Sequence, residues 1–339
     1  MSNNTAALLH TRKSKMVALT AGAACLLVLA IASVLMGEQT FGLDDLWASY
    51  RHFNGSNEHL ILRTARVSRV LVAVAVGACL AVAGAVMQVL TRNPLASPSV
   101  FGINAGASLF IVIGLVLYGS ALTMNMMIWI AFAGALFVSI CVYAMAMRGS
   151  WFEPVKLTLA GAAMGAFASS ITSGLILINK QSLDAALFWM IGSVSGRKLD
   201  HLLSVAPYMA IGLGLSLLLS GSLNIMMLGE ESARSLGQRV TLVRLLSSLA
   251  VVLLAGSSVS AAGPIAFVGL IVPHLCRALI GQDHRWLLPC CALSGAVLLV
   301  AADLAARFVL MPKEVPVGIA TAMLGVPFLI HAARRKAND

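Results

Sequence analysis

An acidic and a basic residue lie four positions apart inside a strongly apolar stretch of the sequence. Asp303 and Arg307 both fall within the run 286–309, and residues four apart share one face of a helix, so the two can pair there. Ionisable groups at membrane depth are costly and often mark a transport route. A self-neutralising structural pair is the simpler explanation. An ion-coupled secondary transporter would need more acids near mid-depth, so this single aspartate gives that class little support.

No residue pattern for covalent or metal chemistry appears in the rest of the chain. The sequence lacks the G-x-x-x-x-G-K-[ST] loop that would bind ATP and the H-E-x-x-H motif of zinc enzymes. The six cysteines lie in or beside apolar runs and form no C-x-x-C pair, so they are expected to be small buried hydrophobic residues. A membrane-embedded enzyme would need a nucleophile or a metal cluster. We therefore predict no catalytic residue, no resident metal and no cofactor.

The polar segment 224–238 is too long and too patterned for a simple turn. Asn224 is expected to cap a short helix, and Gly229 to break it. A second short helix is expected to run from Glu230 and to stop at Gly237. Two such helices would form a knob on which another protein docks. An ordinary connection at the membrane surface explains the composition equally well, and the residues alone leave both interpretations open.

Several glycines and prolines lie in or beside the apolar runs. Proline breaks a membrane helix and frees backbone groups, which suits a cavity or a hinge, whereas small residues spaced as G-x-x-x-G let helices pack closely. Turn formation and packing are the simpler explanations for these patterns. A role in the transport route or its gate is predicted for Asn93, Pro94, Gly161, Gly165, Pro264 and Pro273.

The composition requires that these residues be held by membrane-spanning helices. Hydrophobic residues make up 59% of the 339 positions and charged residues 11%, whereas soluble chains carry about 25% charged residues. The basic residues behind the net charge of +10 are scattered between apolar runs. They indicate contact with lipid headgroups rather than with nucleic acid. The fold class is therefore all-α and polytopic, with residues 1–339 forming one transmembrane domain.

About ten segments are long and apolar enough to cross a bilayer, which takes about 20 residues of helix. They are 16–36, 69–90, 100–117, 125–147, 157–178, 201–221, 241–262, 265–280, 286–309 and 317–332. A short amphipathic helix at the interface is expected over 182–191. Gly263 and Pro264 leave open whether the seventh and eighth spans are one kinked helix. The first span follows basic residues as a signal peptide does, but it is long enough to remain as an uncleaved helix.

The distribution of basic residues orients the chain with its N-terminus inside. Most of these residues then fall on the cytoplasmic side, as the positive-inside rule predicts. Arg63, Arg66 and Arg69 form a cluster on the outside that works against this bias. Positive charge kept outside in spite of the rule suggests that there is a reason for keeping it there.

Several motifs, in order along nearly the whole chain, resemble the iron-siderophore and cobalamin ABC importer permease family, the FecCD-type transmembrane subunits. The matching stretches are Gly84 with Gln88, then 92–98 (RNPLASP), 101–107 (FGINAGA), 228–237 (LGEESARSLG), 262–274 (AGPIAFVGLIVPH), 302–307 (ADLAAR) and 316–318 (PVG). Each motif is weak alone, and together they are specific. The resemblance implies an ABC importer type II permease fold with ten spans.

The family resemblance also implies partners. A soluble ABC ATPase dimer would bind on the cytoplasmic side, and a periplasmic or lipid-anchored substrate-binding protein would dock outside. Two permeases would pair around the substrate path, as a homodimer or as a heterodimer of paralogues. Coupling to the ATPase is then expected at Leu228, Gly229, Glu230, Glu231, Ser232, Ala233, Arg234, Leu236 and Gly237.

By the same resemblance, the binding protein is expected to dock on Arg66, Arg69 and Arg307. The Arg-x-Pro-Arg element of the family is replaced here by Arg-Val-Ser-Arg over residues 66–69, without the proline. Exposed arginines form bidentate pairs with carboxylates. Arg307 therefore has two interpretations, docking and pairing with Asp303.

The expected function is that of the membrane-spanning permease of an ABC importer for iron chelates, located in the bacterial inner membrane. The chain would translocate a ferric siderophore or ferric citrate delivered by the binding protein, while the separate ATPase hydrolyses ATP. A cobalamin or haem importer permease is the alternative, and an ion-coupled secondary transporter is a more distant one. The sequence shows no carboxylate or Cys/His cage for bare iron, which fits a chelated cargo.

Overall fold

The computed structural model describes residues 8–37, 39–147, 153–179, 183–310 and 313–338, and their regular structure is helical. Seven of the helices in these ranges are long and apolar enough to cross a membrane. They are α1 (Arg12–Leu35), the continuous helix Asn57–Leu90, α6 (Met124–Ala146), α7 (Pro154–Ile178), α9 (Leu199–Leu218), α12 (Val240–Ala262) and α14 (His284–Val309). Shorter apolar helices are α5 (Ile103–Tyr118), α13 (Val268–Ile280) and the Val317–Ile330 part of α15 (Val317–Asn338). Each of the ten expected spans is thus a helix.

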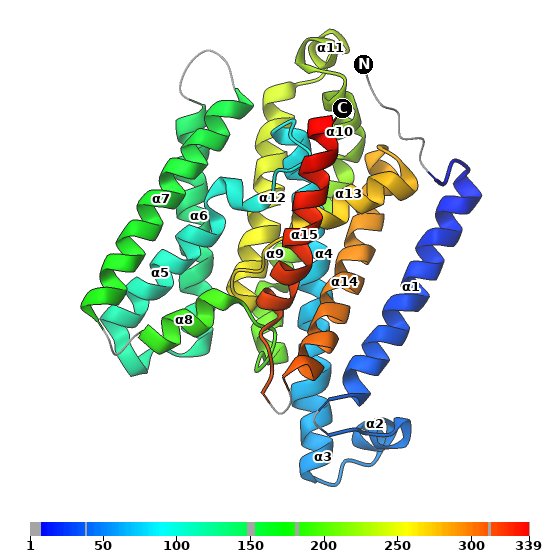
Figure 1. The fold of residues 1–339 in the computed structure, drawn as a ribbon, viewed down its shortest axis with the longest axis vertical. Coiled ribbons are helices and arrows are strands. Elements are labelled where there is room, and N and C mark those ends of the chain that lie inside the picture. The colour runs from blue at the N-terminus through cyan, green and yellow to red at the C-terminus, as the bar shows by residue number, and fades with distance from the viewer. Residues whose placement is uncertain (1–7, 38, 148–152, 180–182, 311–312, 339) are drawn as a thin grey trace.

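Short helices lie at both ends of the bundle (Figure 1). The second spanning helix begins early, as α3 (Asn57–Leu60) and a π-helical stretch (Ile61–Arg66) that lead into α4 (Val67–Leu90). Near α3 lies α2 (Leu43–Arg51), and we call this the α2 end. The opposite end, here the α11 end, carries α10 (Ser220–Met227) and α11 (Glu230–Ser235), and the start of α1 and the end of α15 lie there too.

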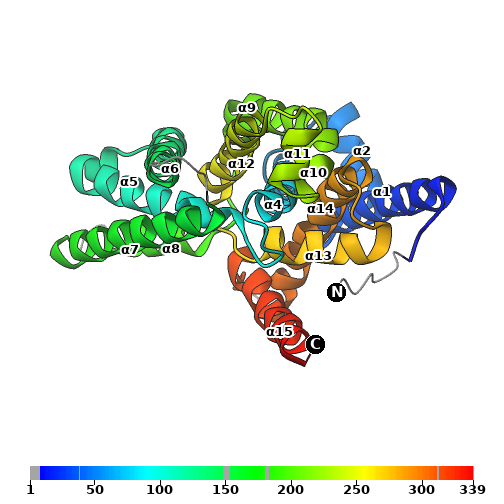
Figure 2. The same ribbon diagram turned by 90° about the horizontal axis from the view of Figure 1, so that it is seen from above.

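The core of the bundle is built around α4, which is central when the molecule is seen from the α11 end (Figure 2). Glycines at its helix crossings have no side chain, so the neighbouring helices can approach α4 closely. A Cβ on Gly77 would lie 2.3 Å from the carbonyl oxygen of Gly295 in α14, and one on Gly84 would lie 1.9 Å from that of Gly269 in α13. Small residues at such crossings maximise dispersion contacts, which drive helix association where lipid removes the hydrophobic effect.

Two helices of the bundle, α5 and α13, begin inside it, each after a short segment that is not α-helical. A 3₁₀ turn, Pro98–Phe101, precedes α5, and Gly102 joins the two with φ +70°. The segment 263–267 separates α12 from α13, with φ +75° at Gly263 and +68° at Phe267. The seventh and eighth spans are therefore two helices and not one kinked helix.

Pro273 lies inside α13 and does not end it. A proline cannot donate to the carbonyl four residues earlier, which here is that of Gly269. The side-chain amide of Gln88 in α4 donates to this carbonyl oxygen at 3.4 Å. A neighbouring helix thus satisfies the acceptor that Pro273 frees, as membrane helices require.

The peripheral helices are α1 and α7, which are the least buried of the seven long spans. In Figure 2 α1 lies at one edge of the bundle, while α7, α5, α6 and α8 (Leu183–Ile191) form a lobe at the opposite edge. Large apolar side chains of α7 such as Leu159, Phe167 and Leu177 are exposed. Such surfaces need lipid or another membrane protein to cover them.

Candidate functional site

Four ionised side chains form a network at the α2 end of the bundle. Nη2 of Arg69, in α4, lies 2.8 Å from Oδ1 of Asp303 in α14, and Arg69 Nε also donates to this carboxylate at 2.9 Å. Arg69 Nη1 donates to the Glu314 carboxylate at 2.7 Å. Arg307 Nη2 donates to Asp303 Oδ2 at 2.6 Å. The expected pairing of Asp303 with Arg307 is confirmed, and both oxygens of Asp303 face arginines.

The network joins several segments that are far apart in sequence. Arg307 Nη1 donates to the Ser33 carbonyl oxygen near the end of α1 at 2.7 Å. Glu314, in the segment before α15, also accepts from the Ser195 hydroxyl at 3.0 Å. Burial by itself raises the pKa of the Glu314 carboxyl, but the charge and hydrogen bonds of Arg69 outweigh it and hold the pKa below the ordinary value. Glu314 therefore stays ionised and keeps Arg69 paired at neutral pH.

The three arginines expected to dock a binding protein differ in their exposure. Arg69 and Arg307 are buried, with 8% and 3% of their surface exposed, which corrects the assumption that they stand free on the outer face. Arg66 is half-buried and donates to the carbonyl oxygens of Met36 and, at 3.0 Å, Gln39. Their role in docking stays a prediction.

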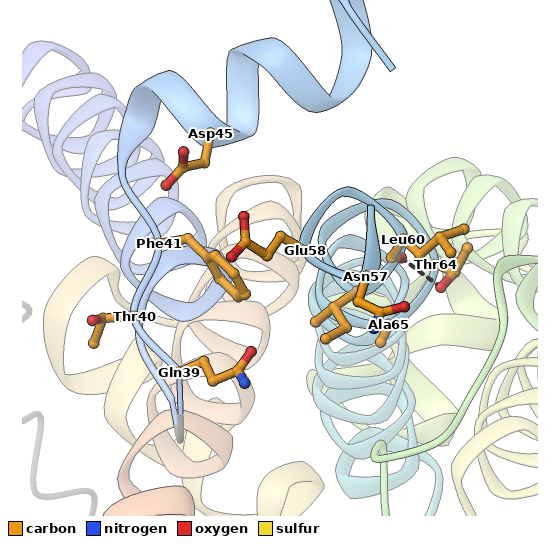
Figure 3. A pocket seen from close by; sticks show the side chains of 10 residues that line it. Gln39, Thr40, Phe41, Asp45, Asn57, Glu58, Leu60, Thr64 and Ala65 are labelled. Carbon is orange, nitrogen blue, oxygen red and sulfur yellow. Dashed lines mark hydrogen bonds between the residues drawn. The ribbon is translucent and has the colours of Figure 1, made fainter. Parts of the chain in front are cut away.

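A pocket that the sequence did not predict lies at the α2 end (Figure 3), and two of its lining residues, Gln39 and Phe41, contact Arg66. It has a volume of about 800 Å³ and lies between the segment that precedes α2 and the start of the Asn57–Leu90 helix. Phe41 and Glu58 face each other across it, and Asp45 lies at its edge. The Asp45 carboxylate accepts from the Gly42 backbone N–H at 2.8 Å, so it caps α2.

The α11 end carries the two short helices expected from the sequence, with one correction. Asn224 does not cap the first helix, because α10 begins at Ser220 and Asn224 lies inside it. Its amide instead links α10 to the start of α14. Asn224 Nδ2 donates to Asp283 Oδ1 at 2.7 Å, and Asn224 Oδ1 accepts from the His284 backbone N–H at 2.8 Å. In the sequence, Asn224 has the residue type of a helix cap. Its actual partners, residues 283 and 284, come close to it only in the folded chain.

The second short helix, α11, is fixed to α12 by a charged bridge. Glu230 accepts from Arg244 of α12 at 2.7 Å and from Arg234 one turn along α11 at 2.7 Å. The hydrogen bond from Arg244 is the main reason that the pKa of Glu230 lies below its ordinary value. The helix ends at Ser235, and the predicted stop residue Gly237 follows the C-cap, with φ +78° and its N–H donating to the Arg234 carbonyl oxygen at 2.9 Å.

Exposed apolar side chains come directly before and after α11, at the α11 end of the bundle. Met227, Leu228 and Leu236 are exposed, Leu228 and Leu236 by 65% and 64%. Together with α11, they form a surface that we call the elbow, residues 227–237. An exposed apolar group of this kind indicates a contact with another protein.

The residues predicted for the transport route are spread over the bundle. Asn93 makes a turn before the 3₁₀ segment, its Oδ1 accepting from the Leu95 N–H at 3.0 Å, and Pro94 is exposed beside it. In α7, a Cβ on Gly161 would lie 1.7 Å from the Val100 carbonyl oxygen, so Gly161 packs within the chain. Apart from its chain neighbours and the backbone of its own helix, no described atom lies within 4 Å of a Cβ on Gly165.

Pro264 and Pro273 occupy different settings. Pro264 lies in the break between α12 and α13 and lines a pocket with residues of α5, α7 and α8. Pro273 is buried inside α13. Pro264 thus lines a pocket, and a gating role for all six predicted positions stays a prediction.

The bundle of apolar helices, the ion network at one end and the elbow at the other define a polytopic helical membrane protein. The chain belongs to the FecCD transport family, whose model matches residues 25–335. It is 48% identical over 286 residues to the Fe(3+)-citrate import system permease protein YfmD of Bacillus subtilis, covering 84% of this chain and 85% of that protein. It is 40% identical to the ferric enterobactin transport system permease protein FepD of Escherichia coli, covering 94% and 95%.

A solved structure shares the same fold. It is described as an inward-facing conformation of a metal-chelate type ABC transporter, and it superposes with a TM-score of 0.81 at 27% identity. The match covers 93% of this chain and 98% of that one. The family and the fold expected from the sequence are thus confirmed.

Proposed function

We propose that this chain is the membrane-spanning permease subunit of an ABC importer that takes up ferric chelates. The observation that carries this proposal is the likeness, over nearly the whole chain, to permeases named for ferric citrate and ferric enterobactin. The chain has no phosphate-binding loop of its own. ATP is therefore hydrolysed by a partner subunit, and the permease contributes a change of conformation between outward-open and inward-open states.

The elbow is the part of the chain that receives force from the ATPase, and it lies on the cytoplasmic side. Three features support this role. It protrudes at the end that also carries the start of α1 (Figure 1), it exposes Leu228 and Leu236, and Glu230 ties it to α12 through Arg244. A rigid knob with an apolar surface can fit a cleft in a partner and transmit its movement to α12 and α14.

The α2 end faces outward and receives the loaded binding protein. Arg66 lies at this end beside the acidic pocket, and its guanidinium is half-buried and not wholly enclosed. Two permeases pair around the substrate path, as identical or paralogous copies. The exposed apolar faces of α7 and α15 are suited to that pairing and to the rocking motion that opens the path.

The elbow assignment is tested by charging its apolar surface. Leu236→Glu puts a carboxylate on the exposed side chain, so the ATPase subunit should be lost from the complex purified through the permease, and ATP-dependent uptake should fall at least tenfold. Leu242→Glu is not a suitable comparison because that side chain lies in a span. The matched control is Leu43→Glu, which charges a leucine that is 62% exposed on α2, at the opposite end of the bundle, and should leave the ATPase bound. Retention of the ATPase and of uptake in Leu236→Glu would argue against the elbow as the docking surface.

A further inference from the structure

A pocket of about 740 Å³ lies between α5, α7 and α8, beside the break that follows α12. Its polar lining consists of amide and hydroxyl groups only, and none of its lining residues is ionisable. The polar residues are Asn104, Ser108, Ser169, Thr172 and Ser173. A pocket of this composition at membrane depth can bind an uncharged polar surface, whereas a buried ion would lack a counter-charge.

One of these hydroxyl groups is buried and has no partner in the described part of the chain. Ser108 is only 6% exposed and lines the pocket. Serine and threonine in helices commonly donate to the carbonyl one turn earlier, as Ser139 does to Ala135 at 2.7 Å and Thr172 to Ala168 at 2.8 Å. Ser108 makes no such bond, and its hydroxyl is open to the pocket. The hydroxyl can therefore donate to an oxygen acceptor that enters the pocket.

The start of α5 adds further donors to the same place. Asn104 lies one turn before Ser108, and its amide also has no hydrogen bond to a described residue. The first N–H groups of α5, after Gly102, have no side-chain cap. Such groups carry partial positive charge and favour oxygen acceptors. Backbone and side-chain donors thus meet at the wall that α5 contributes.

The pocket continues toward the other broken helix. Asn104 also lines a smaller pocket of about 190 Å³, together with Ser97, Ser99 and the start of α13 at Phe267. The helix α13, like α5, begins without a side-chain cap. Neutral polar groups therefore run from the α7 side of the bundle to the gap between the two helix starts.

We propose that this pocket is a contact site for the organic shell of the cargo, and that it selects chelates whose outer surface offers uncharged oxygen acceptors such as hydroxamate or amide carbonyls. The donors of Ser108, Asn104 and the start of α5 bind those oxygens as the chelate passes. The apolar lining, including Leu187 and Met190, contacts the carbon skeleton. This inference rests on the proposed function, because it takes the cargo to be a ferric chelate.

The test is uptake of radioactive iron by proteoliposomes that contain the complete importer and its loaded binding protein. The probes are a neutral ferric trihydroxamate and anionic ferric citrate. Ser108→Ala should slow uptake of the trihydroxamate about fivefold, the effect of one lost hydrogen bond, and Ser108→Thr should restore it. Asn104→Asp should slow it further because a carboxylate cannot donate. The matched control is Ser139→Ala, which removes a buried hydroxyl from α6.

The outcomes separate the pocket from the proposed function. If the unaltered importer takes up neither chelate, the proposed function fails. If it takes up ferric citrate only, the function stands and the selectivity assigned to the pocket is wrong. The pocket makes no specific contact if the unaltered importer takes up the trihydroxamate and Ser108→Ala and Asn104→Asp do so at the same rate. The same conclusion follows if the control Ser139→Ala is as slow as Ser108→Ala. The amount of each variant in the membrane and its basal ATP hydrolysis are measured alongside, so that misfolding is recognised.

Discussion

Replacing Asp303 by asparagine should destabilise the bundle more than any other single change of charge at the α2 end. Asp303 is 1% exposed and accepts from Arg69 and Arg307, which are 8% and 3% exposed. Removing one partner of a buried ion pair costs about 3–5 kcal/mol, because the remaining charge is left without compensation. Arg69 keeps Glu314, and Arg307 keeps the Ser33 carbonyl oxygen. We therefore expect a loss near the lower limit, about 3 kcal/mol.

Denaturant unfolding of the detergent-solubilised protein, followed by tryptophan fluorescence, measures this loss. The control is Glu314→Gln, which removes the other carboxylate on Arg69 but at a side chain that is 43% exposed. Exposed pairs contribute about 1 kcal/mol or less, so this control should change the stability little. Equal and small losses for Asp303→Asn and Glu314→Gln would refute the reasoning that burial makes Asp303 the centre of the network.

Two further predictions concern packing and pH. Gly84→Ala places a methyl group against the Gly269 carbonyl oxygen and should lower the unfolding midpoint by an amount equivalent to about 1–3 kcal/mol, whereas Gly165→Ala, with nothing described within 4 Å, should leave it unchanged. Because Arg244 lowers the pKa of Glu230 from its ordinary 4.5, the bridge should contribute fully above about pH 4.5 and be lost as the pH falls through the lowered value. The difference in thermal midpoint between the unaltered protein and Glu230→Gln should be constant from pH 7 to 5 and shrink below pH 4.5. A difference that already shrinks between pH 7 and 5 would contradict the assignment.

Much of the fold could be predicted because lipid leaves the chain few alternatives. Apolar runs of spanning length must become helices, and each predicted span is one. The positions of Gly229 and Gly237 predicted the breaks around α11, because left-handed backbone favours glycine. The sequence could not show whether α12 and α13 are two helices or one kinked helix, because Gly263 and Pro264 are consistent with both.

The features that the sequence did not predict depend on contacts between residues that are far apart in the chain. The spacing of Asp303 and Arg307 predicts their pairing, but nothing near Arg69 predicts that it joins them. Asn224 has the residue type of a cap, and its partners lie about 60 positions away. The buried hydroxyl of Ser108 is indistinguishable in sequence from those that bond their own helix. Burial and partner choice come from the packing of separate spans, which no local pattern records.

Transport itself is the most direct test of the central claim, that this chain moves ferric chelates by coupling to a separate ATPase. Proteoliposomes are prepared with the permease, its co-purified ATPase and the loaded binding protein, and radioactive iron inside them is counted over time. We predict uptake that requires ATP hydrolysis, continues when ionophores collapse all ion gradients, and stops when the ATPase is omitted. Uptake by the permease alone, driven by a proton or sodium gradient without nucleotide, would contradict the account.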